Sequence, residues 1–140
     1  MTRTFRPRMA RYVCIVLAIL LIAATAALFF VAPSFGQYAW TTRDYVGTII
    51  VDLFLLWLLW IQYQVRLEVR DRGIYIKNLI HSHSLDWEQL VGVDLGDGPW
   101  VRIDTTDGTV VNVMAIQSAD GDYARREAVR LATLIDRMQA

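Results

Sequence analysis

Two apolar runs of membrane-spanning length fill most of the first half of the chain. Residues 12–32 contain no charged residue, and residues 45–65 contain only one, Asp52. A bilayer core about 30 Å thick is crossed by about 20 residues of helix. Backbone groups in lipid must be satisfied internally, which favours helices over other structures. The pattern therefore predicts transmembrane helices over residues 12–32 and 45–64, joined by a loop over residues 33–44.

A secretory signal peptide is the alternative for the first run, because basic residues also precede it. The run is longer than the usual apolar core of such peptides, which spans about 7–15 residues. Bulky side chains occupy residues 28–31, where small ones favour cleavage. We therefore expect a retained helix.

The period of the apolar positions changes to two at the end of the second run. Residues 63–70 alternate between apolar and polar side chains, which predicts a half-buried strand. A soluble domain is therefore expected over residues 65–140, directly after the second helix and without a flexible linker. A tight turn ending at Gly73 follows, where this glycine is expected to adopt a positive φ. A second strand is predicted over residues 73–79.

Three more apolar segments predict strands in the middle of the soluble domain. Residues 85–95 form one strand region, which a proline-containing break ends. Residues 101–104 and 109–114 flank Asp107-Gly108, which is a strong hairpin signal. About six short strands are therefore expected.

The last segment returns to a helical period. Its apolar stripe, with spacings of 4, 3, 4 and 3, consists of Ala124, Ala128, Leu131, Ile135 and Met138. Candidates for the cap of this helix are Ser118, Asp120 and Asp122. The fold class is therefore α+β, with a two-helix transmembrane hairpin, a small antiparallel sheet and one C-terminal amphipathic helix that covers it.

Three motifs of the soluble domain resemble those of bacterial PH domains. They are the Asp71-Arg72-Gly73-Ile74 turn, a Trp-centred strand from Leu85 to Val93, and the Asp107-Gly108 hairpin. Two transmembrane helices before such a domain resemble the actinobacterial group named after low molecular weight protein antigen 6. The resemblance covers residues 63–138 and implies a PH-like β-barrel or sandwich. The positions that carry the fold motif are Gly73, Trp87, Asp107 and Gly108. The resemblance brings no catalytic residues with it.

Arginines flank the two apolar runs unevenly. Short loops rich in Lys and Arg stay on the cytoplasmic side of a membrane. The arginines before the first run are Arg3, Arg6, Arg8 and Arg11, those after the second are Arg66, Arg70 and Arg72, and the loop carries only Arg43. This bias predicts a multi-pass plasma-membrane protein with both termini cytoplasmic, in which residues 1–11 form a basic N-terminal segment.

Aromatic side chains mark both borders of the predicted hairpin. Tyr and Trp concentrate at membrane–water interfaces because their rings are amphipathic. The expected inner anchors are Tyr12, Trp57, Trp60 and Tyr63, and the expected outer ones are Tyr38, Trp40 and Tyr45.

Charge and cysteine content narrow the classes of function. Residues 66–140 carry nine basic and twelve acidic side chains, which argues against nucleic acid as a partner. A lipid-binding surface would normally show clustered Lys and Arg, and its best candidates here are Arg66, Arg70 and Arg72. The single cysteine, Cys14, excludes an intrachain disulfide and a zinc site built on a cysteine pair.

Asp52 is the sharpest single feature of the apolar runs. A carboxyl group at such depth is costly and usually faces a partner or an aqueous path. Thr25 lies at a matching depth in the other run, and Thr48 lies one turn away from Asp52. These three residues are candidates for helix packing or assembly, with ion handling as the alternative.

The remaining candidates for chemistry are isolated. His81 and His83 share a strand face but lack a defined third ligand, so we expect surface histidines rather than a metal site. Trp100 is either a core residue or an exposed contact for a partner. No nucleophile, phosphate-binding or zinc-protease motif is present. We therefore expect no enzymatic activity and no cofactor.

Together these patterns predict a membrane-anchored PH-like domain that acts as a non-enzymatic interaction or scaffold module at the inner face of a bacterial plasma membrane. Its expected partners are the lipid bilayer and a membrane or cytoplasmic protein, with a homo-oligomer left open. Two alternatives remain: an accessory subunit of a membrane transport or envelope-biogenesis complex, and a lipid-binding sensor.

Overall fold

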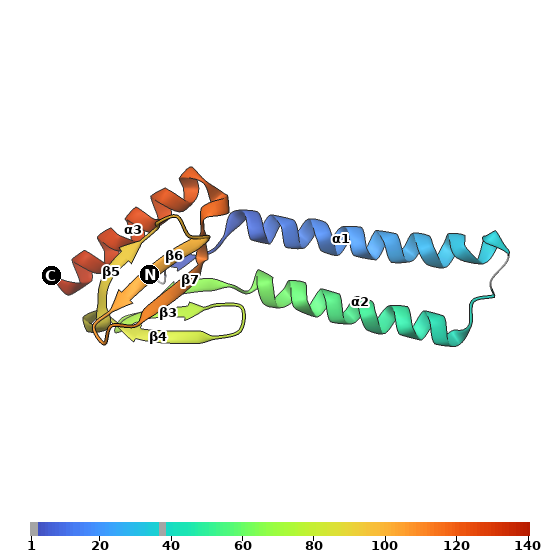
Figure 1. Cartoon of the computed structure of the whole chain (residues 1–140), viewed down its shortest axis with the longest axis horizontal. Coiled ribbons are helices and arrows are strands. Elements are labelled where there is room, and N and C mark those ends of the chain that lie inside the picture. Colours follow the sequence, from blue (N-terminus) through green and yellow to red (C-terminus); the bar gives the residue numbers. More distant parts are fainter. Residues whose placement is uncertain (1–2, 37–38) are drawn as a thin grey trace. The chain divides into compact units, whose positions relative to one another are not determined.

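The computed structural model describes residues 3–36 and 39–140, which form two compact units (Figure 1). The sandwich unit combines the N-terminal segment through Met9 with Gln64–Ala140. The helical unit is Ala10–Tyr63. Because the first helix starts at Arg8, its first two residues belong to the sandwich unit.

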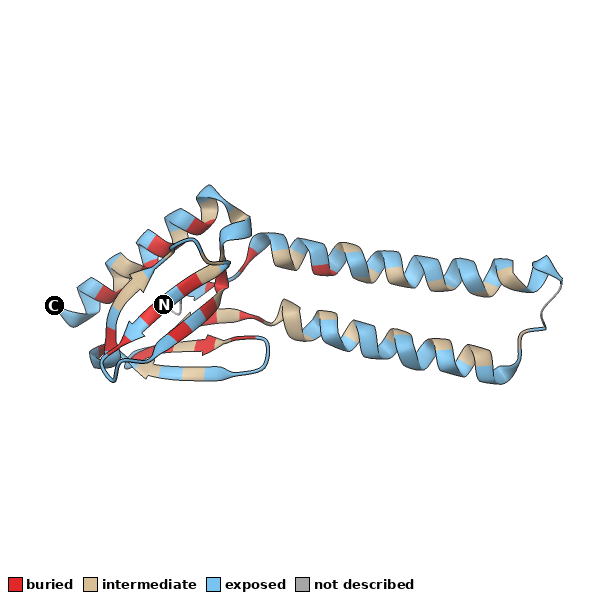
Figure 2. Cartoon of the chain, viewed as in Figure 1, coloured by how far each residue is buried: buried red, intermediate tan, exposed pale blue. Residues whose placement is uncertain are grey.

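The helical unit consists of two long apolar helices. They are α1 (Arg8–Val31), which continues into a 3-10 turn, η1 (Ala32–Phe35), and α2 (Thr42–Tyr63). Both helices are long and apolar enough to cross a membrane. Most of their apolar side chains are exposed on the protein surface, as the pale blue ribbon in Figure 2 shows.

The sandwich unit contains two antiparallel sheets and a helix. The first sheet has the order β1 (Thr4–Phe5), β2 (Arg66–Val69), β3 (Gly73–Lys77) and β4 (Ser82–Asp86). The second has the order β5 (Leu90–Asp94), β6 (Trp100–Thr105) and β7 (Val110–Gln117). The C-terminal helix is α3 (Asp122–Gln139). This open sandwich with one helix confirms the predicted α+β, PH-like fold.

The first strand comes from the N-terminus, where the sequence indicated only a basic segment. Thr4 pairs with Glu68 and Phe5 pairs with Leu67 in an antiparallel register. The Phe5 side chain is only 2% exposed and lies in the core of the sandwich. The chain therefore forms the first strand of the sheet, then both apolar helices, and only then the second strand.

The core of the sandwich is built by both sheets and one stripe of α3. Buried residues follow the strands and this stripe in Figure 2. Ala124, Ala128, Leu131 and Ile135 are all buried, as their helical spacing predicts. Met138 is 47% exposed, so its assignment to the stripe was wrong. The stripe ends there because Gln139 instead donates its amide to the carbonyls of Trp87 and Leu90 at 2.6 Å each.

Trp87 lies in a 3-10 turn, η2 (Trp87–Gln89), and not in a strand as the sequence suggested. Asp86 and Gln89 form a reciprocal capping box around this turn, which stops β4 and lets the chain change sheets. The Trp87 ring is nevertheless buried, and its Nε1 donates to the Asp71 carbonyl at 3.0 Å. Trp87 is thus a core residue at a corner between the two sheets.

Gly73 is required by close packing and not by a positive φ. The described glycines with positive φ are Gly36, Gly108 and Gly121, so the expectation for Gly73 was wrong. A Cβ at Gly73 would lie 1.9 Å from the carbonyl oxygen of Leu85. The β3–β4 pair therefore needs glycine because its backbones approach too closely for any side chain.

No side chain caps α3, contrary to the expectation for Ser118, Asp120 or Asp122; its N-cap is Gly121. Asp120 instead accepts hydrogen bonds from the backbone amides of Arg8 and Met9, at 3.0 and 2.7 Å. These amides are the first of α1 and lack intrahelical partners. Asp120 therefore caps the start of the first apolar helix, within the sandwich unit.

The Asp107-Gly108 hairpin forms as predicted between β6 and β7, with Gly108 at a φ of 84°. Asp107 accepts hydrogen bonds from the Thr105 hydroxyl and from the amide and hydroxyl of Thr109. These bonds, the one from Thr105 first, lower the pKa of Asp107 from 3.8 to about 2. The turn is thus stabilised by an ionised carboxylate.

Candidate functional site

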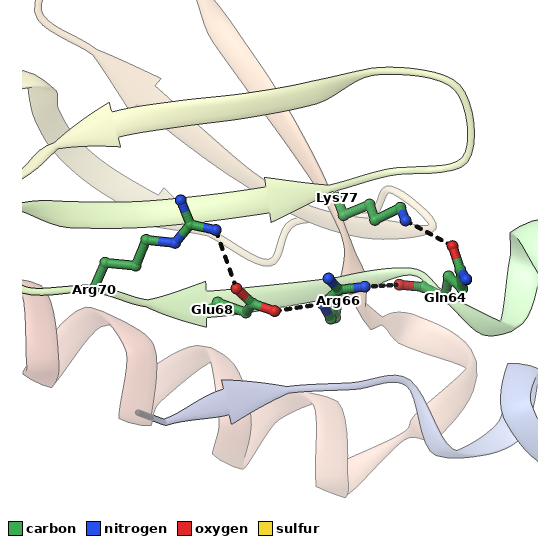
Figure 3. Close-up of polar contacts among 5 residues, drawn as sticks. All are labelled: Gln64, Arg66, Glu68, Arg70 and Lys77. Carbon is green, nitrogen blue, oxygen red and sulfur yellow. Dashed lines mark hydrogen bonds and ion pairs between the residues drawn. The ribbon is translucent and has the colours of Figure 1, made fainter. Parts of the chain in front are cut away.

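A cluster of charged and polar side chains lies where β2 begins, directly after the second apolar helix. We call Gln64, Arg66, Glu68, Arg70 and Lys77 the β2 cluster (Figure 3). Arg66 Nε contacts Glu68 Oε1 at 2.5 Å, and Arg70 contacts the other oxygen at 3.3 Å. Lys77 Nζ donates to Gln64 Oε1 at 2.6 Å, and Arg66 also donates to the Gln64 carbonyl at 3.3 Å. Side chains from β2 and β3 thus meet the first residue after α2.

The electrostatics of the β2 cluster are those of a compensated network. The hydrogen bond from Arg66 is the largest cause that holds the pKa of Glu68 below its ordinary value; burial opposes it, and Arg70 adds to the lowering. Glu68 thus stays ionised and offsets part of the charge of both arginines. Arg70 also lies 4.3 Å from the centre of the Tyr75 ring. The cluster is therefore not an open basic patch, because its one carboxylate contacts both arginines.

Only two of the three arginines proposed to face lipid belong to the β2 cluster. Arg66 and Arg70 contact the two oxygens of the same Glu68 carboxylate, whereas Arg72 is not a member of the cluster. Arg72 is exposed at the β2–β3 turn, where its carbonyl accepts a hydrogen bond from the Trp87 amide at 3.1 Å. Arg66 and Arg70 therefore share one site, and Arg72 lies outside it.

A second polar site lies inside the helical unit, where α1 and α2 meet. Thr25 Oγ1 donates to Asp52 Oδ2 at 2.6 Å, and both residues are partly buried. Thr48 does not join this pair; its hydroxyl donates to the Asp44 carbonyl at 2.8 Å, one turn earlier in α2. The structure thus brings together Thr25 and Asp52 and separates Thr48 from them.

Aromatic side chains gather at both ends of the helical unit. Trp40 and Tyr45 both pack against Phe29, with ring centres 6.1 and 4.9 Å away. At the other end Trp60 stacks on Tyr63 at 6.2 Å, and Arg11 lies 4.1 Å from the centre of the Tyr63 ring. The other two predicted inner anchors, Tyr12 and Trp57, are 65% and 55% exposed. Tyr38 lies outside the described residues.

Several contacts of the N-terminal segment were not predicted from the sequence. Besides the amides bound by Asp120, the Arg8 guanidinium lies 3.9 Å from the centre of the Tyr123 ring. Arg130 lies 5.4 Å from the centre of the Phe5 ring. A two-residue strand is too short for a periodic pattern, so only its phenylalanine among arginines offered a signal.

The remaining candidates show no shared site. Trp100 is partly buried at the start of β6, where it pairs with Gln117. His81 and His83 line one shallow hollow of about 230 Å³ beside β7. Among the described residues, no group of three or more His, Cys, Asp or Glu side chains is placed to hold a metal ion.

Comparison with known proteins agrees with this architecture. Uncharacterized proteins of Mycobacterium tuberculosis and Mycobacterium bovis are 33% identical over 84 residues, which is 59% of this chain and 54% of each relative. The chain thus spans about half the length of the curated relatives it matches. No solved structure matches the chain. Residues 64–133, half of the chain, match the family described as Bacterial PH domain, a typically non-catalytic module. With its sandwich and closing helix, the chain belongs to the bacterial PH domain family.

Proposed function

We propose that this protein is a membrane-anchored PH-like module that works by binding a protein partner at the inner face of a bacterial plasma membrane. The helices α1 and α2 serve as a transmembrane hairpin with both termini cytoplasmic. The sandwich unit presents the binding surface and performs no chemistry of its own.

One observation carries this proposal: the sheet contains strands from both sides of the hairpin. β1 precedes α1 and β2 follows α2, and the two strands are hydrogen-bonded neighbours. Val69 extends the pairing by donating its amide to the Arg3 carbonyl at 2.8 Å. Two segments of one sheet cannot lie on opposite sides of a bilayer, so this pairing supports two crossings.

The charge distribution supports the cytoplasmic side for the sandwich. Seven arginines precede α1, start it or follow α2 within a few residues, whereas residues 33–44 carry only Arg43 and Asp44. Loops rich in Lys and Arg are retained in the cytoplasm during insertion. The hairpin then holds the sandwich by two connections, Pro7 to α1 and Gln64 from α2.

The pairing of β1 with β2 offers a direct test in membranes. Cysteines are placed at Thr4 and Glu68 in a Cys14→Ala background, and isolated membranes are treated with a copper–phenanthroline oxidant. Directly opposed strand positions have Cβ atoms about 4.5–5.5 Å apart, so we expect an intrachain disulfide, detected as a gel shift that a reductant reverses. The matched control pairs Thr4 with Ser84 on β4, which is separated from β1 by two strands.

Reporter fusions test the side of the membrane. We expect green fluorescent protein after Ala140 to fluoresce, and alkaline phosphatase inserted after Gly36 to be active. An active phosphatase at the C-terminus would overturn the cytoplasmic assignment. A Thr4/Glu68 pair that crosslinks no better than the Thr4/Ser84 pair would remove the main support for the hairpin.

A second candidate function is favoured by the pair of Thr25 and Asp52. A hydrogen-bonded carboxyl group within an apolar helix is a recognised means of joining helices in a membrane, so this chain is a candidate subunit of a transport or envelope-biogenesis complex. Crosslinking in native membranes separates the two functions. Partner capture that is lost in Asp52→Leu but kept in Asp52→Asn, with the sandwich unchanged, favours the complex subunit.

The lipid-sensor alternative finds less support in the structure. Glu68 compensates Arg66 and Arg70, and Arg72 lies at the other end of β2. Binding to anionic vesicles that weakens steeply with salt, measured against an Arg66→Gln variant, would restore this alternative.

A further inference from the structure

The turn between β3 and β4 exposes two large apolar side chains that the fold does not use. The Asn78 amide donates to the His81 carbonyl at 3.0 Å, which closes a tight turn with Leu79 and Ile80 at its corner. Corners of tight turns favour Gly, Pro, Asn, Asp and Ser. Ile80 is instead 83% exposed and Leu79 is 38% exposed. Neither residue belongs to the core of the sandwich.

This turn lies at the end of the sheet where the chain arrives from α2. Arg66, the first residue of β2, is paired with Lys77, the last residue of β3. The turn therefore begins level with the start of β2. Lys77 reaches back to Gln64, as Figure 3 shows. Gln64 is bonded directly to Tyr63, the last residue of α2.

The base of the turn is held rigidly. Asn78 is 8% exposed, and its side chain donates to the Asn112 carbonyl at 2.6 Å and accepts from the Met114 amide at 3.1 Å. These bonds join the end of β3 to β7 in the other sheet. The apolar corner is therefore presented by a fixed scaffold, so little ordering is needed for it to insert.

The surroundings of the turn suit a lipid surface. Residues 77–83 contain one lysine and two histidines but no acidic residue. Val110, which is 53% exposed, adjoins the turn along the same hollow. An apolar tip flanked by basic and polar groups is the pattern of segments that lie in the headgroup layer of a membrane.

We propose that Leu79 and Ile80 insert into the interfacial layer of the bilayer that α1 and α2 cross, and so fix the orientation of the sandwich on the membrane. The occupant of this surface is lipid. This inference rests on the proposed membrane anchoring, because the Lys77 side chain at the base of the turn contacts Gln64, the residue that follows α2 in the chain. The turn acts as a third attachment besides the two connections of the hairpin.

Depth-dependent quenching tests this insertion in the full-length protein. Single cysteines in a Cys14→Ala background are labelled with an environment-sensitive fluorophore and reconstituted into phosphatidylethanolamine–phosphatidylglycerol vesicles with doxyl lipids. We expect the label at Ile80→Cys to shift to the blue and to be quenched by a doxyl group near the headgroup. The matched control is Arg72→Cys at the opposite end of β3, about 15–20 Å away by strand rise, and its label should not be quenched.

A label at Leu53→Cys, in the middle of α2, distinguishes failure of turn insertion from failure of the membrane anchor. Quenching of Leu53 by a deep doxyl group without quenching of Ile80 overturns this inference and leaves the membrane anchor intact. No quenching at Leu53 overturns the anchor itself. A blue-shifted Ile80 label that escapes doxyl lipid and depends on protein density assigns the turn to a second copy of the chain, which also overturns insertion.

A substitution provides an independent check. Ile80→Asp should abolish quenching of a label at Leu79→Cys, because a charged corner stays in water. The same change at Val129 on α3, which is 66% exposed, should leave that quenching unchanged. Quenching that persists in Ile80→Asp would refute the inserted corner.

Discussion

Truncation of Phe5 to alanine tests whether the N-terminal strand is an integral part of the sandwich. Phe5 is 2% exposed and packs in the common core although it comes from a strand of only two residues. Aromatic side chains bury about 150–250 Å², and at about 25 cal/mol per Å² the lower figure corresponds to about 4 kcal/mol. Phe→Ala substitutions in cores cost about 3–5 kcal/mol. Because β1 is a short edge strand that relaxes easily, we expect a loss of about 3 kcal/mol.

Two measurements on the full-length chain in nanodiscs test this loss of stability: the midpoint of thermal unfolding and the rates of amide hydrogen exchange. For a domain of 60–100 residues, about 3 kcal/mol lowers the unfolding midpoint by roughly 12–24 °C. Exchange should also accelerate at the Val69 amide, which is bonded to Arg3, while peptides of the helical unit stay protected. Thr4→Ala is the matched control, because Thr4 is exposed in the same strand. If both variants lie within about 0.5 kcal/mol of the wild type, the N-terminus is not part of the core.

Three further predictions concern single contacts of the sandwich. Gly73→Ala should destabilise it by at least about 1–3 kcal/mol, whereas Gly92→Ala, whose Cβ would meet no atom within 4 Å, should change the melting temperature little. Asn78→Leu should cost about 2 kcal/mol or more, because it removes the partner of both the Asn112 carbonyl and the Met114 amide, and Asn112→Ala should change the melting temperature little because Asn78 bonds only its backbone carbonyl. The folded-state pKa of Asp107 is depressed to about 2, so its stabilisation is complete above about pH 4 and is lost as the pH falls towards 2; Asp107→Ala should remove this part of the pH dependence of the melting temperature, and an unchanged profile would contradict it.

The broad fold could be predicted because its strongest signals are periodic and local. The long apolar runs, the period-2 alternation of apolar and polar residues, and the apolar stripe of α3 each repeat the same signal over many residues. The contact of Thr25 with Asp52 was also within reach, because helices of matched length bring equal depths together. Asp86 and Gln89 have the spacing of a capping box, which is a local sequence signal for the turn at Trp87.

The remaining features depend on contacts between distant parts of the chain. The burial of Phe5 in the core and the capping of α1 by Asp120 produce no periodic sequence pattern, because each depends on one or two residues. Gly73 was recognised as necessary, but for a conformational reason, whereas the cause is the approach of another strand. Glu68 offsets the positive charge of Arg66 because the two side chains are in contact, and the net charge of the sequence does not reveal this contact.

The insertion of both helices between β1 and β2 has a consequence for biosynthesis. The ribosome makes β1 first, but its partner strand emerges only after α1, η1 and α2 have been completed. Closing so long a loop in a free chain is entropically costly and slow. A hairpin already threaded through a bilayer returns its two ends to one surface and so removes much of that search. The pairing of β1 with β2 would then report that membrane insertion has succeeded, and chains that fail to insert would expose an incomplete core to cellular proteases.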